Sequence, residues 1–131
     1  MVSPNNPIKP MEANIMRNFN IKADDNFDVV IVLNGLRLAE RDMQKRLDEA
    51  KEEGSRVEYY EMKLREVEAV YARMDVVWQK NNYNAAKRYA GDDERSKAEL
   101  RVERIKLEEA NARLSLAKII YEESEKAWLK S

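Results

Sequence analysis

The chain has 131 residues, which suits one ordinary domain, and its 24 Lys and Arg balance 25 Asp and Glu to a net charge of −1. An even charge balance argues against a protein that meets nucleic acid or an anionic membrane through bulk charge. The absence of Cys and His excludes a disulfide framework, thiolate chemistry and the commonest catalytic base. We therefore expect no enzymatic activity, no cofactor, no metal site and no small-molecule substrate.

The composition of the chain and the placement of its prolines both favour long helices. Ala, Glu, Lys, Leu and Arg supply 65 of the 131 residues, and no proline follows Pro10. No apolar run approaches the length of a membrane span, and the first residues lack the basic segment and apolar core of a secretory signal. These features predict no membrane association and a soluble location, cytoplasmic or within a particle.

Residues 1–26 are interpreted as an extended N-terminal arm. Asn and Pro dominate its first ten positions. Met11, Ile15, Met16 and Phe19 then recur at helical spacing, which is compatible with a short amphipathic helix. Such a helix is too short to be stable alone, so we expect it to dock on another surface.

The remaining residues, 27–131, are expected to form one coiled-coil domain of three helices. The first helix spans residues 27–53, where Leu36, Ala39, Met43, Leu47 and Ala50 form a stripe. Residues 27–35 are ambiguous because Val29 to Val32 are β-branched and Asn34-Gly35 could form a hairpin turn or a helix start. With Phe19 and Ile21 upstream, a small β-hairpin that turns at residues 23–26 is a further alternative. We favour helix because no other strand-like run exists to build a sheet.

The helix predicted over residues 55–90 carries an unbroken heptad seam, formed by Val57, Tyr60, Leu64, Val67, Tyr71, Met74 and Trp78. Val70 and Val77 widen this seam. A capping box, Ser55-Arg56-Val57-Glu58, is expected to start the helix after Gly54. The next seam position is Asn81, a polar residue that either fixes register or marks a frayed end.

The helix predicted over residues 92–130 is apolar on two sides. One side repeats the heptad spacing, at Leu107, Ala110, Leu114, Ala117, Tyr121, Ser124 and Trp128. Val102, Ile105, Ala112, Leu116 and Ile119 lie on nearly the opposite side. A helix with two apolar sides is covered on both. We expect the second side to be covered by the first helix, the arm or another subunit.

Short turns at Gly54 and Gly91 make the three helices antiparallel neighbours, so the expected fold is all-α, an elongated three-helix bundle or coiled-coil hairpin. Unequal helix lengths leave the far ends of the last two helices as a two-helix tip. The arm, this tip and the second side of the last helix are the expected partner-binding regions. Their candidate residues are Met11, Ile15, Phe19, Trp78, Tyr83, Lys87, Arg88, Tyr89, Ile105, Leu116, Ile119 and Trp128.

Two groups of polar residues suggest a ligand-binding role, and each also has a simpler structural explanation. The segment from Lys80 to Tyr89 mixes amides, basic residues and aromatics, as a phosphate-binding surface does, but basic residues also complement the negative end of a helix. The pairs Glu58, Glu61 and Glu99, Glu103 could hold Mg²⁺ or Ca²⁺, although bundle metal sites normally include His. We interpret both groups as ordinary solvated surface.

The sequence therefore predicts a structural or scaffolding protein of a larger assembly, such as a phage or viral particle, acting through protein contacts or self-association. One alternative is an adaptor, chaperone or inhibitor that binds a single target protein. A second alternative is a nucleic-acid-binding regulator that uses Lys80, Lys87 and Arg88.

Overall fold

The computed structural model describes residues 26–131, and this part of the chain is almost entirely helical. Its helices are α2 (Asn26–Glu53), α3 (Val57–Tyr89) and α4 (Glu94–Lys130), with no strand among the described residues. The predicted all-α fold with three helices is confirmed, and each boundary lies within two residues of the expected one. The N-terminal arm, including Met11, Ile15 and Phe19, lies outside the described residues.

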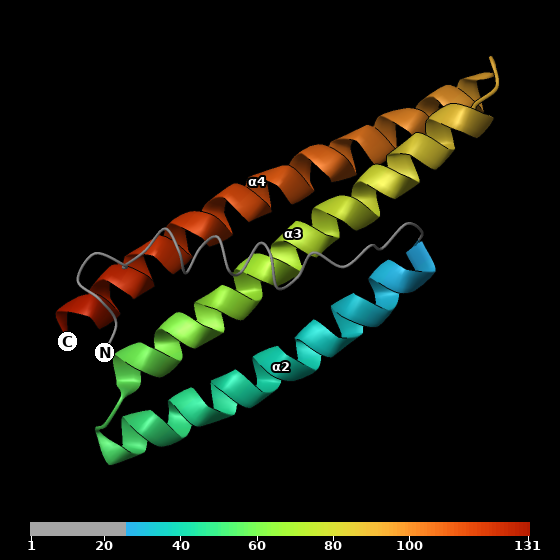
Figure 1. Ribbon diagram of the computed structural model, residues 1–131. Helices are drawn as coiled ribbons and strands as arrows, with labels where there is room; N and C mark the ends of the chain where they lie inside the picture. Colours follow the sequence, from blue (N-terminus) through green and yellow to red (C-terminus); the bar gives the residue numbers. More distant parts are fainter. Residues whose placement is uncertain (1–25) are drawn as a thin grey trace.

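The helix α3 lies between α2 and α4 and packs against both, whereas α2 and α4 make at most a weak contact with each other (Figure 1). Contacts along α3 show that its neighbours run antiparallel to it. Arg37 of α2 bonds Tyr71 of α3, and the start of α2 meets the later residues Asn81 and Asn82. On the other side, Tyr59 near the start of α3 contacts Trp128 near the end of α4. At about 1.5 Å per residue, α4 is roughly 55 Å long, so the molecule is elongated.

The ambiguous residues 27–35 are helical, as part of α2. Val29 is fully buried, and Val32 and Leu33 pack against the same core. β-Branched residues lower intrinsic helix propensity only slightly, and burial of their side chains against α3 outweighs that preference. The strand alternative for residues 27–35 is therefore wrong.

The turn between α2 and α3 is made by backbone geometry. Gly54 adopts φ of 67°, and the Ser55 amide donates to the Ala50 carbonyl over 3.1 Å, which is the bond that closes a Schellman C-cap. Arg56 occupies the N-cap position of α3 with φ of 61°, and no side chain caps this helix end. The predicted capping box is wrong because the left-handed Arg56 ends the turn, so that Ser55 is not the N-cap residue.

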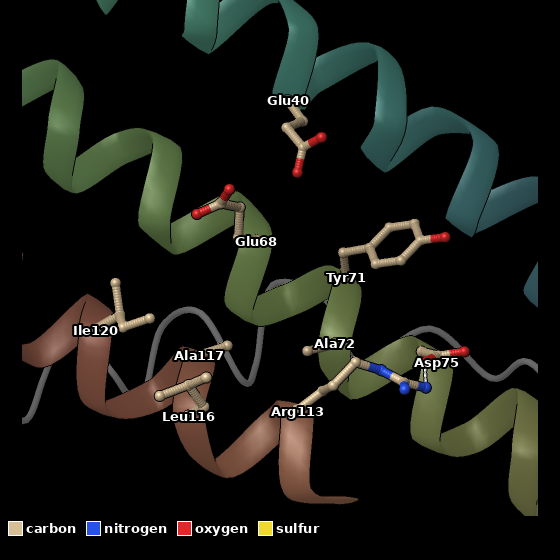
Figure 2. A pocket seen from close by; sticks show the side chains of 9 residues that line it. All are labelled: Glu40, Glu68, Tyr71, Ala72, Asp75, Arg113, Leu116, Ala117 and Ile120. Carbon is tan, nitrogen blue, oxygen red and sulfur yellow. Dashed lines mark hydrogen bonds and ion pairs between the residues drawn. The ribbon is translucent and has the colours of Figure 1, made fainter. Parts of the chain in front are cut away.

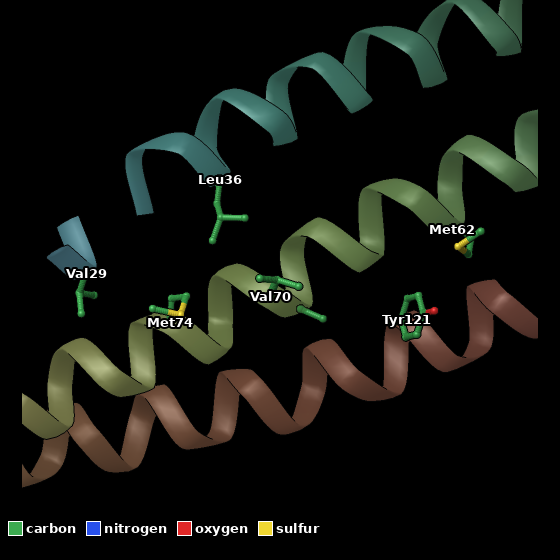
Figure 3. Close-up of a cluster of buried hydrophobic side chains, with 7 residues drawn as sticks. Val29, Leu36, Met62, Val70, Met74 and Tyr121 are labelled. Atoms are coloured by element: carbon green, nitrogen blue, oxygen red, sulfur yellow. The ribbon is translucent and has the colours of Figure 1, made fainter. Parts of the chain in front are cut away.

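The core follows the length of α3 and draws side chains from all three helices (Figure 3). Val29 and Leu36 enter from α2 and Tyr121 enters from α4, with Met62, Val70 and Met74 of α3 between them. The seam predicted on the last helix is the side that α4 buries, since Ala110, Tyr121 and Ser124 are all buried. The interior of the bundle therefore lies in two rows, one on each side of α3.

Among the described helices, α3 is the one that packs against two others, α2 on one side and α4 on the other. In addition to its predicted seam, α3 buries Met62, Ala69 and Ala72. These three positions are separated by 7 and 3 residues, which is heptad spacing. Two of them are alanines, whose weak hydrophobicity makes the pattern hard to detect in the sequence. By contrast, α2 does not cover the second apolar side of α4, as the sequence had suggested it could.

Candidate protein-interaction surface

The second apolar side of α4 forms a surface that we call the outer α4 face: Val102, Ile105, Ala112, Leu116 and Ile119. The four large side chains are exposed by 49%, 49%, 58% and 53% in that order. The five positions of this face are separated by 3, 7, 4 and 3 residues, so their side chains lie in one row along the helix. Exposed apolar side chains that share one side of a helix make this surface a candidate for protein interaction.

Two leucines show how sharply α4 is divided. Leu114 is half-buried on the side that packs against α3, whereas Leu116, two residues later, is exposed on the outer α4 face. A rotation of about 100° per residue places residues two apart on nearly opposite sides. The division of α4 into an inner and an outer side therefore comes from sequence spacing alone.

A groove lies beside the outer α4 face, bounded by α2 and α4 and floored by α3 (Figure 2). It has a volume of about 290 Å³ and contains Leu116 and Ile120 of α4 together with Tyr71 and Ala72 of α3. The outer face therefore continues around Leu116 into a concave apolar surface. Such a surface suits the side chains of a partner helix.

Three of the charged side chains that line this groove form ion pairs. Arg113 Nη2 of α4 donates to Asp75 Oδ2 of α3 over 2.9 Å, and Figure 2 shows its side chain reaching across the helix interface. Glu68, on the groove wall, accepts from Arg65 of its own helix over 2.7 Å. The pair of Arg113 and Asp75 therefore joins α4 to α3 at this groove.

The two tryptophans among the predicted binding residues lie against the core. Trp78 of α3 and Trp128 of α4 are both partly buried and pack onto the core cluster. The Trp128 ring also makes an edge contact with Tyr59, with 5.9 Å between ring centroids. These side chains therefore hold the helices together.

The predicted residues of the tip lie at the far end of α3. Since the start of α2 meets Asn81 and Asn82, the residues of α3 beyond Asn82 extend past α2, and α4 is the one described helix beside them (Figure 1). Lys87, Arg88 and Tyr89 are exposed there, and the Lys87 ammonium lies 5.6 Å from the centroid of the half-buried Tyr83 ring.

The asparagines in this segment have a structural role. Asn81 Nδ2 donates to Asn26 Oδ1 over 3.2 Å, and Asn26 Nδ2 donates to Asn82 Oδ1. Because these bonds fasten the first residue of α2 to α3, they account for part of the polar run that resembled a phosphate-binding segment. These hydrogen bonds account for Asn81 and Asn82 of the run within the chain itself. They do not involve the basic residues of the run.

Three of the four glutamates considered for a metal site pair with a basic residue of their own helix. Glu61 pairs with Arg65, Glu99 pairs with Arg95 and Glu103 pairs with Lys106. Within residues 26–131, no three acidic side chains gather in a way that could hold a metal ion.

Two features of the structure had no place in the sequence interpretation. Glu125 is fully buried in α4, and its Oε2 accepts a hydrogen bond of 2.7 Å from the Tyr121 hydroxyl. On α2, Phe27, Ile31 and Leu38 form an exposed apolar row that we call the outer α2 strip. Their spacing of 4 and 7 was visible in the sequence, but the continuous apolar run from Val29 to Leu33 obscured it.

Comparison with known protein families, with curated proteins and with solved structures finds no match to this chain. None of the helices in the described residues combines the length and apolar character needed to cross a membrane.

Proposed function

We propose that the protein is a structural helical module that joins a larger protein assembly through the outer α4 face. The observation that carries this proposal is the exposure of Val102, Ile105, Leu116 and Ile119, by about half each, on the side of α4 opposite the one that packs against α3. The row is apolar except at Glu109, and exposed apolar surfaces on soluble proteins commonly mark sites of protein interaction.

A second apolar surface supports a scaffolding role over the binding of a single target. The outer α2 strip lies on the side of α2 opposite its buried residues Val29, Leu36 and Leu47. The strip and the outer α4 face belong to different helices, which lie on either side of α3 (Figure 1). Two separate apolar surfaces can contact two neighbours at once, which an adaptor for one partner does not require.

Site-specific photo-crosslinking in cells of the native source tests the proposal. A photoreactive residue in place of Leu116 is expected to form adducts of defined mass with a protein partner. The matched control places the same residue at Asn111, which is exposed on α4 but off the outer face. Equal crosslinking from both positions, or none from Leu116, would contradict a role for this face.

A further inference from the structure

We propose that the partner on the outer α4 face is a second copy of this chain, whose own α4 packs against it antiparallel. This inference rests on the proposed function and specifies the partner. The outer face extends to a full seam at positions 98, 102, 105, 109, 112, 116, 119 and 123, with alternating steps of 4 and 3. That period is the one with which two helices pack side by side along their length.

The polar members of the seam select the direction of pairing. In a parallel pair of α4 helices, each seam residue faces its own counterpart, so Glu109 would face Glu109 and Glu123 would face Glu123. Like charges held together in a partly desolvated seam are unfavourable. A parallel pair is therefore disfavoured at two of its layers.

The antiparallel arrangement places the two Glu123 side chains at opposite ends of the interface and offsets the two Glu109 side chains by three residues, about 4.5 Å along the helix axis. Reversing the second helix about the midpoint between residues 110 and 111 sets Val102 against Ile119 and Ile105 against Leu116. Each apolar pair occurs twice by the two-fold symmetry. Glu109 then faces Ala112, whose small side chain lets the carboxylate reach the edge of the interface. The apolar layers from Val102 to Ile119 span about 25 Å.

The charges beside the seam fit this register at its ends. Arg101 of one copy lies across from Glu122 of the other, again twice. Lys106 lies across from Arg113, but each already has an acidic partner in its own chain. Lys106 Nζ is 3.5 Å from Glu103 and Arg113 Nη2 is 2.9 Å from Asp75. Their charges are therefore offset before the second copy arrives.

The inner side of α4 provides a comparison within the same molecule. It carries the same alternating spacing from Leu107 to Trp128, and it packs antiparallel against α3. The outer α4 face differs in lacking a helix of the described residues upon it. A second α4 would give it the partner that α3 gives the inner side.

Light scattering after size-exclusion chromatography tests the stoichiometry, with the full chain at low and high micromolar concentration. We expect a mass that rises toward twice 15.4 kDa with concentration. Leu116→Asp should remain monomeric at every concentration and keep its helical circular dichroism. The matched control is Leu129→Asp, which alters another exposed leucine of α4, beyond the row from Val102 to Ile119, and it should dimerise as the unaltered chain does.

Disulfide trapping tests the direction, since the chain has no cysteine of its own. A mixture of Ile105→Cys and Leu116→Cys should form a crosslinked heterodimer, because these positions face each other only in the antiparallel pair. Crosslinking of each single variant to itself in preference to the mixture would indicate parallel pairing and overturn the inference.

The outcomes separate this inference from the proposed function. A chain that stays monomeric at high concentration, while Leu116 crosslinks to a different protein, overturns self-association and leaves the interaction surface in place. A monomer whose Leu116 crosslinks to nothing overturns both. A dimer that persists in Leu116→Asp also overturns the inference, since its interface must lie elsewhere.

Discussion

Arg113 of α4 and Asp75 of α3 form a hydrogen-bonded ion pair of 2.9 Å across the interface between their helices, beside the groove that adjoins the outer α4 face. The pair fixes the register of two helices whose apolar seams alone would tolerate a shift by one heptad. Its two members are unequally exposed, since the Arg113 side chain is 54% accessible and that of Asp75 only 19%.

A double-mutant cycle on this pair measures its contribution. We expect Arg113→Ala and Asp75→Ala to be coupled by about 0.2–1 kcal/mol in the free energy of unfolding, because the exposed guanidinium is screened by water. Urea denaturation of the four variants at low and high salt gives the coupling. A coupling that does not decrease in high salt would contradict an electrostatic origin.

The core of the bundle is expected to be sensitive to cavities. Leu64 of α3 is 1% exposed, and Leu64→Ala should lower the free energy of unfolding by about 2–5 kcal/mol through lost packing and an unfilled space. Leu38→Ala, an identical change at an exposed position of α2, should change it by no more than about 0.5 kcal/mol. Similar losses in the two variants would show that Leu64 is not a core residue.

The glycines Gly54 and Gly35 should respond in opposite directions to alanine. Gly54 has φ of 67°, so Gly54→Ala places a side chain in a left-handed conformation and should cost about 1 kcal/mol. Gly35 lies inside α2 with open space at its Cβ position, and Gly35→Ala should gain about 0.5–1 kcal/mol. The melting temperatures of the two variants, compared with that of the unaltered chain, measure both changes. A loss in both would indicate that Gly35 is needed for a close contact.

Glu66 of α3 gives the protein a predictable response to pH. Burial raises the pKa of Glu66, although Lys63, with its Nζ 3.7 Å away, acts to lower it. A pKa above the unfolded value means that the folded protein binds this proton more tightly, so protonation stabilises the fold. That stabilisation is present below the unfolded pKa, about 4.3 for Glu, and is lost as pH rises through the folded pKa.

Glu66→Gln removes the buried charge, and we expect it to raise the melting temperature at neutral pH. The gain should disappear in acid, where the carboxyl of the unaltered protein is already protonated. Thermal melts between about pH 3 and about pH 8 follow this difference. The control is Glu52→Gln, at an exposed position of α2, which should show no such trend. A lower melting temperature for Glu66→Gln at neutral pH would show that the pair with Lys63 outweighs burial.

Local patterns in the sequence were sufficient to predict the three helices and their antiparallel order. Freedom from proline, the heptad spacing of Leu107 to Trp128 and the glycine at position 54 act within one helix or one turn, so they can be recognised without knowledge of the rest of the fold. The division of α4 between the inner Leu114 and the outer Leu116 is of the same kind. Arg56 is an exception, because its left-handed conformation has no sequence signal and displaced the expected capping box.

Only the tertiary structure decided which helix is central and which apolar surfaces remain open. The sequence could not show that α3 is covered on both sides, because its second row uses Ala69 and Ala72, which carry little hydrophobic signal but allow α3 and its neighbours to approach closely. Nor could it show that Asn26 binds Asn81 and Asn82 or that Glu125 is buried beside Tyr121. These features depend on residues brought together from different turns and helices, and helical periodicity describes only one helix at a time.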